Sequence, residues 1–80
     1  MATVEFPWDA QLVSVRREVC PRATWDTAHC AWVMSDADAA AFLRAAQARM
    51  FFRKCSCTLA IDGAVWVVGF KPNTPYRLQV

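Results

Sequence analysis

The sequence predicts an α+β fold, in which a single helix packs on an antiparallel sheet of about five strands. The expected order of elements is βββαββ, and a short C-terminal strand could extend it. Two local signals carry this prediction. The segment Ser35-Asp36-Ala37-Asp38 has the composition of a helix start, and Asp62-Gly63 lies at the centre of a hairpin pattern. With 80 residues, the chain is expected to form one small domain spanning residues 1–80.

Three strands are expected before the helix. The segment Thr3–Phe6 precedes a proline, Leu12–Val19 is rich in valine, and His29–Met34 leads into the helix start. The polar segment Arg22–Thr27 is read as a loop. A last strand is expected at Tyr76–Val80.

The predicted helix begins at Ser35, whose hydroxyl can accept a hydrogen bond from the free amide of Asp38. Its apolar side chains recur at the spacing of one helical face and should cover the sheet. They are Ala39, Phe42, Leu43, Ala46 and Met50.

The hairpin prediction rests on Asp62-Gly63, which suits a two-residue turn with positive φ. Pairing outward from this turn places apolar residues on one shared face. The expected pairs are Ile61 with Ala64, Leu59 with Trp66, Cys57 with Val68 and Cys55 with Phe70.

Composition and charge narrow the class of protein. Apolar residues make up 56% of the chain, so an exposed apolar patch is expected to mark a partner surface, and a homodimer could use it. Residues 1–40 carry a net charge of −3, and residues 41–80 carry +5. We find neither a signal peptide nor a membrane-length apolar run, so we expect a cytoplasmic protein with reduced cysteines.

No pattern predicts catalysis, a metal site or a cofactor. Cys55-Ser56-Cys57 on a strand would separate its two thiolates by about 6.6 Å, which is wide for one zinc ion. We therefore assign both cysteines to the core. The only histidine, His29, has no suitable nucleophile beside it, and the two glycines form no phosphate loop. We expect a protein that is not an enzyme.

Tryptophan and arginine dominate the energetics of many protein interfaces. On this basis the expected partner-binding residues are Trp8, Arg22, Trp25, Arg53, Lys54 and Lys71. The basic second half could instead meet nucleic acid, with Phe51, Phe52 or Tyr76 available for stacking on bases. The moderate pI of about 8.5 favours a protein partner over direct nucleic-acid binding.

Three segments carry a resemblance to known proteins, namely Trp25-Asp26-Thr27, the run from Trp32 to Phe42 and Pro75–Gln79. They resemble small tail-assembly proteins of bacteriophages, in which a strand leads into a helix opened by a Ser/Thr-Asp-Ala motif. The resemblance implies a phage or mobile-element origin and assigns no functional residue. The small size, the expected reduced cysteines, the absence of a catalytic set, the split charge and the surplus of aromatic residues suggest a protein-binding module of this origin, one that inhibits a host defence complex as an anti-CRISPR protein does. A structural or assembly component of a phage particle and a small nucleic-acid-binding protein are the alternatives.

Overall fold

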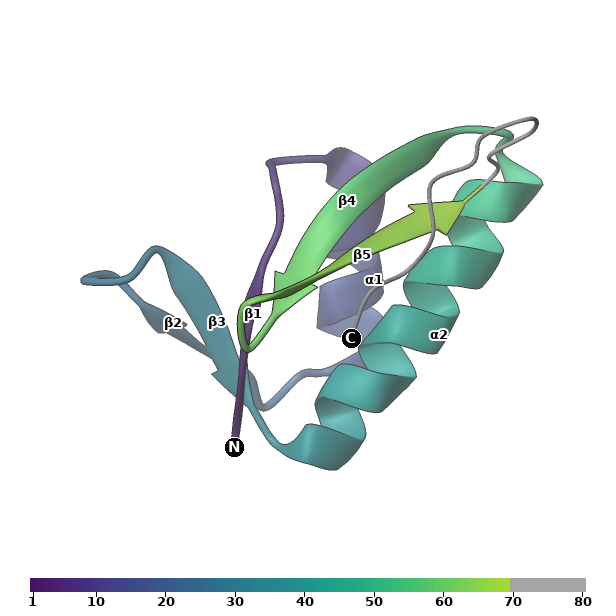
Figure 1. Ribbon diagram of the computed structural model, residues 1–80. Helices are drawn as coiled ribbons and strands as arrows, with labels where there is room; N and C mark the ends of the chain where they lie inside the picture. The colour runs from purple at the N-terminus through teal and green to yellow at the C-terminus, as the bar shows by residue number, and fades with distance from the viewer. Residues whose placement is uncertain (70–80) are drawn as a thin grey trace.

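Seven elements of secondary structure follow one another in the computed structural model, which describes residues 1–69 (Figure 1). In chain order they are β1 (Ala2–Glu5), α1 (Ala10–Val19), β2 (Thr24–Asp26), β3 (Ala31–Met34), α2 (Asp36–Phe52), β4 (Ser56–Ile61) and β5 (Ala64–Gly69).

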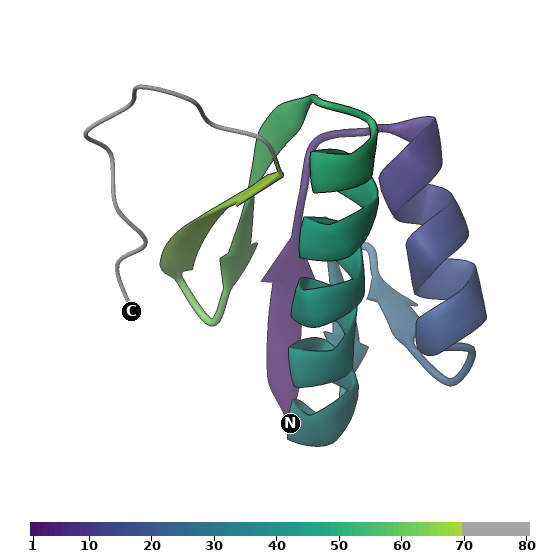
Figure 2. The same ribbon diagram turned by 90° about the vertical axis from the view of Figure 1, so that its right-hand side faces the viewer.

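The five strands form one antiparallel sheet in the order β2-β3-β1-β4-β5. Helices follow β1 and β3, so the first six elements have the connectivity of the ferredoxin-like βαββαβ motif, and β5 extends the sheet beside β4. Figure 2 shows α1 and α2 side by side on the same face of the sheet. Within residues 1–69, no helix lies on the other face of the sheet.

The predicted α+β class, with a helix packed on a five-stranded antiparallel sheet, is confirmed. The prediction of a single helix is wrong, because the segment Leu12–Val19 is not a strand but most of α1. Asp9 caps this helix by accepting hydrogen bonds from the backbone N–H groups of Gln11 and Leu12, at 2.8 and 3.2 Å. Leu12 and Val15 are fully buried at helical spacing.

The remaining boundaries differ by small amounts. The predicted first strand, Thr3–Phe6, is β1 shifted by one residue. The predicted loop Arg22–Thr27 contains the short strand β2, and His29 stands in the turn before β3 rather than in the strand. The predicted strand at Tyr76–Val80 lies outside the described residues.

The helix and hairpin predictions are confirmed where the structure describes them. The Ser35 hydroxyl accepts a hydrogen bond from the Asp38 N–H at 3.1 Å. Along the predicted apolar face of α2, four residues are buried and Leu43 is half-buried. The β4–β5 register pairs Ile61 with Ala64, Leu59 with Trp66 and Cys57 with Val68 as expected. The expected partner of Cys55, Phe70, lies outside the described residues.

The core lies between the helices and the covered face of the sheet. Phe42 is fully buried at its centre, and its ring contacts that of Phe6 at a centroid distance of 5.4 Å. Leu12 and Val15 contribute from α1, and Val4 contributes from the central strand. An exposed Arg49–Glu18 ion pair also links the two helices.

Asp62 joins the hairpin to the rest of the sheet. It has a φ of +51° and Gly63 a φ of +87°, as a two-residue turn with two positive φ angles requires. The Asp62 N–H donates to the Thr3 carbonyl at 2.8 Å, and the Asp62 carboxylate accepts from the Thr3 N–H at 2.8 Å. This pair of bonds continues the short β1–β4 pairing, which otherwise consists of Val4 with Ile61 and Glu5 with Ala60.

At the end of β5, Gly69 occupies a position in which a side chain would overlap with neighbouring atoms. Its φ is +100°, and a Cβ there would lie 2.1 Å from the carbonyl oxygen of Cys55 and 2.6 Å from the Met50 Cβ. The Gln47 side chain accepts a hydrogen bond from the Gly69 N–H at 2.8 Å, which fixes the strand end against α2.

We therefore predict different costs for alanine at two glycines that both have positive φ. Gly69→Ala should lower the free energy of unfolding by at least about 3 kcal/mol, because it adds a steric overlap with backbone to the conformational strain. Gly63→Ala should cost only about 1 kcal/mol, because nothing lies within 4 Å of its added Cβ. Urea denaturation of both variants measures the difference, and equal costs would contradict the close approach at Gly69.

Candidate binding surface

A hollow lined by aromatic side chains is the most distinctive surface feature of the described chain. It has a volume of about 580 Å³ and lies among the β1–α1 loop, α1 and the β2–β3 hairpin. We call it the aromatic hollow. Its lining residues are Phe6, Trp8, Val13, Trp25, Cys30 and Trp32.

The fold brings two of the predicted contact residues together in this hollow. Trp8 is 81% exposed in the loop before α1, and Trp25 is 50% exposed on the short strand β2. Trp25 pairs with Trp32 in the β2–β3 register, and their rings meet edge-to-face at a centroid distance of 5.2 Å. On Trp32, the Arg16 guanidinium of α1 stacks 4.0 Å from the ring centroid. Trp25 is therefore held against a packed pair of side chains, Trp32 and Arg16, and does not belong to a free loop.

The turn beside the hollow is held by Asp26. Its carboxylate accepts hydrogen bonds from the backbone N–H groups of Ala28 and His29 and lies 2.8 Å from the Nδ1 of His29. The His29 side chain, through its hydrogen bond, is the main cause that lowers the pKa of Asp26 below its usual value. Cys30, which follows with a φ of +51°, is exposed at the edge of the hollow.

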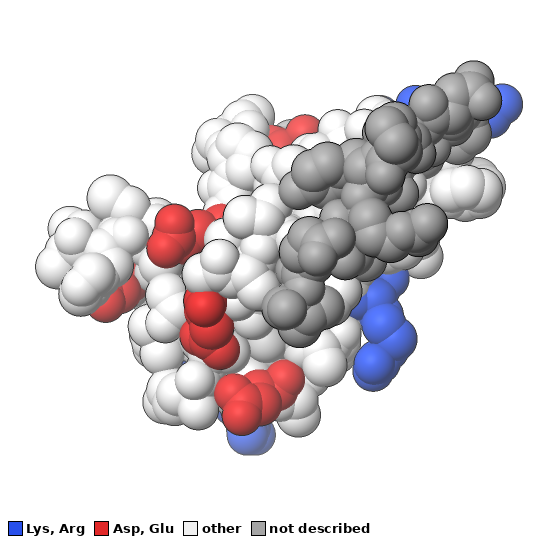
Figure 3. Space-filling view, viewed as in Figure 1, with Lys and Arg blue, Asp and Glu red and all other residues white. Residues whose placement is uncertain are grey.

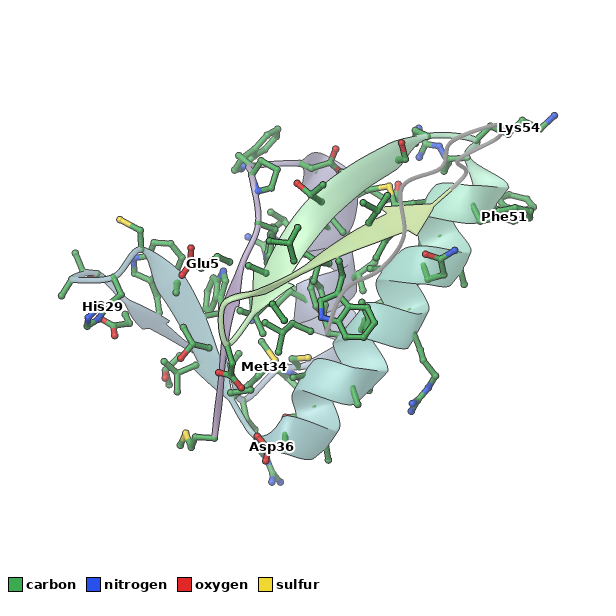
Figure 4. All side chains as sticks on the ribbon, viewed as in Figure 1. Glu5, His29, Met34, Asp36, Phe51 and Lys54 are labelled. Atoms are coloured by element: carbon green, nitrogen blue, oxygen red, sulfur yellow. The ribbon has the colours of Figure 1, made fainter. Side chains whose placement is uncertain are left out.

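A second exposed surface lies at the end of α2. We call residues Phe51, Phe52, Arg53 and Lys54 the α2 tip. Phe52 is 85% exposed, and both cationic residues are exposed as well. Figure 4 shows Phe51 and Lys54 at the end of α2 remote from Asp36. The Arg53 guanidinium donates to the Gln11 side-chain carbonyl at 2.6 Å, which ties the tip to the start of α1.

Lys54 occupies a backbone position that usually belongs to glycine. Its φ is +57°, its N–H donates to the Phe51 carbonyl, and the Cys55 N–H donates to the Met50 carbonyl. These two bonds define a Schellman motif, in which Lys54 is the left-handed residue. The sulfur atoms of Cys55 and Met50 lie 3.8 Å apart and provide the apolar contact that often accompanies this motif.

The six predicted contact residues do not form one patch. Trp8 and Trp25 share the aromatic hollow, whereas Arg53 and Lys54 are neighbours on the α2 tip. Arg22 is exposed in the turn before β2, and Lys71 lies outside the described residues. Sequence reasoning missed Phe6, Val13 and Trp32 as lining residues of the hollow, because their convergence depends on the unpredicted helix α1.

The cysteines have separate environments. Cys57 is half-buried on the core side, as predicted, and its burial raises the pKa of its thiol. The same prediction for Cys55 is wrong, because Cys55 precedes β4 and is exposed. Cys20 is buried and donates to the Asp38 carbonyl at 3.3 Å, and burial raises its pKa too. Within residues 1–69, no three His, Cys, Asp or Glu side chains are grouped as a metal ion would need.

The uncovered face of the sheet has no aromatic or basic side chain among the described residues. β1 contributes Thr3 and Glu5 to this face, and β3 contributes Ala31 and Val33. Proteins that bind single-stranded RNA on an open sheet of this connectivity stack bases on aromatic residues there. The exposed aromatic rings of residues 1–69 lie elsewhere, in the aromatic hollow and at the α2 tip.

A scan against protein-family models returns no match for this chain, and searches of the curated proteins and of the solved structures return none either. Neither α1 nor α2, the helices found in residues 1–69, is long and apolar enough to cross a membrane.

We predict that Lys54→Gly stabilises the protein by about 0.5–1 kcal/mol. Glycine avoids the cost of a Cβ in the left-handed conformation, and that gain exceeds its larger entropy loss on folding. A thermal or urea unfolding curve measures the change. Arg53→Gly is the matched control and should destabilise, because Arg53 has helical φ and donates to Gln11. A Lys54→Gly variant less stable than the wild type would contradict the Schellman geometry.

Proposed function

We propose that this chain is a non-catalytic protein-binding module of phage or mobile-element origin. In this proposal it acts in the host cytoplasm and inhibits a host defence complex by occupying one of its surfaces, as anti-CRISPR proteins do. The observation that carries the proposal is the meeting of Trp8 and Trp25, two exposed tryptophans, on one apolar hollow.

The rigidity of the aromatic hollow supports this proposal as much as its apolar area does. Large aromatic side chains supply much of the energy of protein interfaces when a partner removes them from water. Trp25 is held by its edge-to-face contact with Trp32, so its ordering on binding costs little conformational entropy. The hollow is also large enough to receive a side chain from the partner, since its volume falls within the range of ordinary binding pockets.

A phage-protection assay tests the proposal. Expression of the wild type in bacteria with an active CRISPR defence should restore plaque formation by a targeted phage. Trp8→Ala and Trp25→Ala should each weaken binding to the defence complex by about 30-fold or more, as expected when a tryptophan that dominates an interface is truncated. Plaque counts and titration of the purified complex measure the two effects. Val65→Ala, at an exposed residue of the uncovered sheet face, is the matched control and should behave as the wild type.

Failure to protect against any defence complex in a panel would contradict inhibition. The protein could then be tested for co-purification with phage particle proteins. If it co-purified with them, with the same dependence on Trp8 and Trp25, a structural or assembly role would replace inhibition as the proposed function. Thermal unfolding of each variant separates loss of binding from loss of the fold.

Direct binding of single-stranded nucleic acid is the second candidate, and a specific observation favours it. One arginine, Arg16, stacks on Trp32 in the aromatic hollow, and Arg22 is exposed in the turn before β2. Exposed aromatic rings next to arginine form stacking platforms for bases. Fluorescence anisotropy with a labelled single-stranded oligonucleotide distinguishes the candidates. Affinity that falls steeply with salt and depends on Trp25 would favour nucleic acid over a protein partner.

A further inference from the structure

A second hollow, of about 400 Å³, lies between the start of α2 and the β4–β5 hairpin. Its apolar lining includes Ala39, Leu43, Ile61 and Trp66, and it also contains Asp36 and Asp62. Both carboxylates are exposed at the rim of this acidic hollow. The Asp36 carboxylate lies 3.4 Å from the N-terminal ammonium group of Met1, and the Asp62 carboxylate accepts a hydrogen bond from the Thr3 N–H, so each retains one oxygen for a further cation. Figure 3 shows acidic side chains gathered over this region of the surface.

The α2 tip has the complementary chemistry at the other end of the same helix. There, the exposed ring of Phe52 is followed by the two exposed cations Arg53 and Lys54. Along α2, Phe52 lies about 25 Å from Asp36 and about 14 Å from Leu43, the lining residue of the hollow nearest to the tip on this helix. In one molecule the two surfaces therefore lie too far apart to meet, as the positions of Asp36 and Lys54 in Figure 4 show.

We propose that the α2 tip of one copy docks in the acidic hollow of a second copy. Phe52 enters the apolar lining, while Arg53 and Lys54 face the carboxylates of Asp36 and Asp62. The contact joins two different surfaces, so each copy keeps one free tip and one free hollow. Such a head-to-tail contact produces rings or open chains rather than a two-fold dimer.

Lys54 provides independent support. A residue other than glycine in a left-handed backbone conformation lowers stability, and such strain is typically retained where the side chain has a role. Glycine would satisfy the Schellman motif at lower cost but would remove the cation from the tip. A lysine at this strained position is accounted for if its ammonium group binds a partner outside its own molecule.

This contact uses none of the residues that line the aromatic hollow. It is therefore a property beyond the proposed function, and either one can fail without the other. Because the contact area of one helix end is small, the association is expected to be weak and visible only at high protein concentration.

Sedimentation equilibrium of the full chain from roughly 10 μM to 1 mM tests the proposal, since weak contacts fall in this range. At low salt the average mass should rise with concentration above the 9.0 kDa of one chain. At an ionic strength of about 0.5 M the rise should shrink, because exposed charges are then screened. Val65→Arg, on the uncovered sheet face, should leave the association unchanged.

Two variants that each lack one side of the contact make the test specific. Phe52→Ala with Lys54→Glu removes the tip, and Ala40→Arg, at an exposed residue that lines the acidic hollow, blocks the other side. Each variant alone should stay monomeric. Their equimolar mixture should form a heterodimer and stop there, because it contains one intact tip and one intact hollow.

Three outcomes would overturn the proposal. They are a wild type that stays monomeric up to 1 mM at low salt, variants that associate as the wild type does, and a mixture that remains monomeric. Far-UV circular dichroism and melting curves confirm that both variants are folded, so none of these results can be attributed to unfolding. The phage-protection assay of Ala40→Arg is independent and should match that of the wild type.

Discussion

The two hydrogen bonds between Asp62 and Thr3 hold the two halves of the sheet in register. On one side of this junction lie β2, β3 and β1, and on the other lies the β4–β5 hairpin. Only two residue pairs of β1 and β4 face each other, so the turn itself supplies much of the connection. Because a slip of one residue would turn every side chain to the opposite face, this junction also determines which side of the hairpin faces α2.

The arrangement of both surface hollows follows from that register. With Val4 opposite Ile61, the apolar side of the hairpin continues the covered face of β1 and leaves the acidic hollow beside the start of α2. On the other side of β1, the same face continues through Trp32 to Trp25. The aromatic hollow lies on this side of β1, where Val13 of α1 lines it together with Trp32 and Trp25.

Sequence reasoning succeeded where a short local signal decides the structure. The hydroxyl of Ser35 and the positive φ angles of Asp62 and Gly63 are such signals. It failed at Leu12–Val19, where the β-branched valines suggested a strand and Arg17 already broke the alternation. The sequence signals that could have corrected it are Asp9, a residue type that favours helix caps, and the i, i+3 spacing of the apolar residues Leu12 and Val15. Packing against α2 then outweighs the modest helix propensity of valine. Without α1, no sequence argument could place Trp8 beside Trp25.

The exposed aromatic residues have a further meaning in a domain of this size. An 80-residue chain has little apolar surface to spare, since a small domain buries a smaller fraction of its surface than a large one. Trp8 and Phe52 nevertheless remain largely exposed, and Lys54 remains in a strained conformation although glycine would relieve it. Each of these residues could be replaced by one that stabilises or solubilises the isolated molecule. They are grouped at two separate surfaces, the aromatic hollow and the α2 tip, and these are the surfaces at which we propose contacts with other molecules.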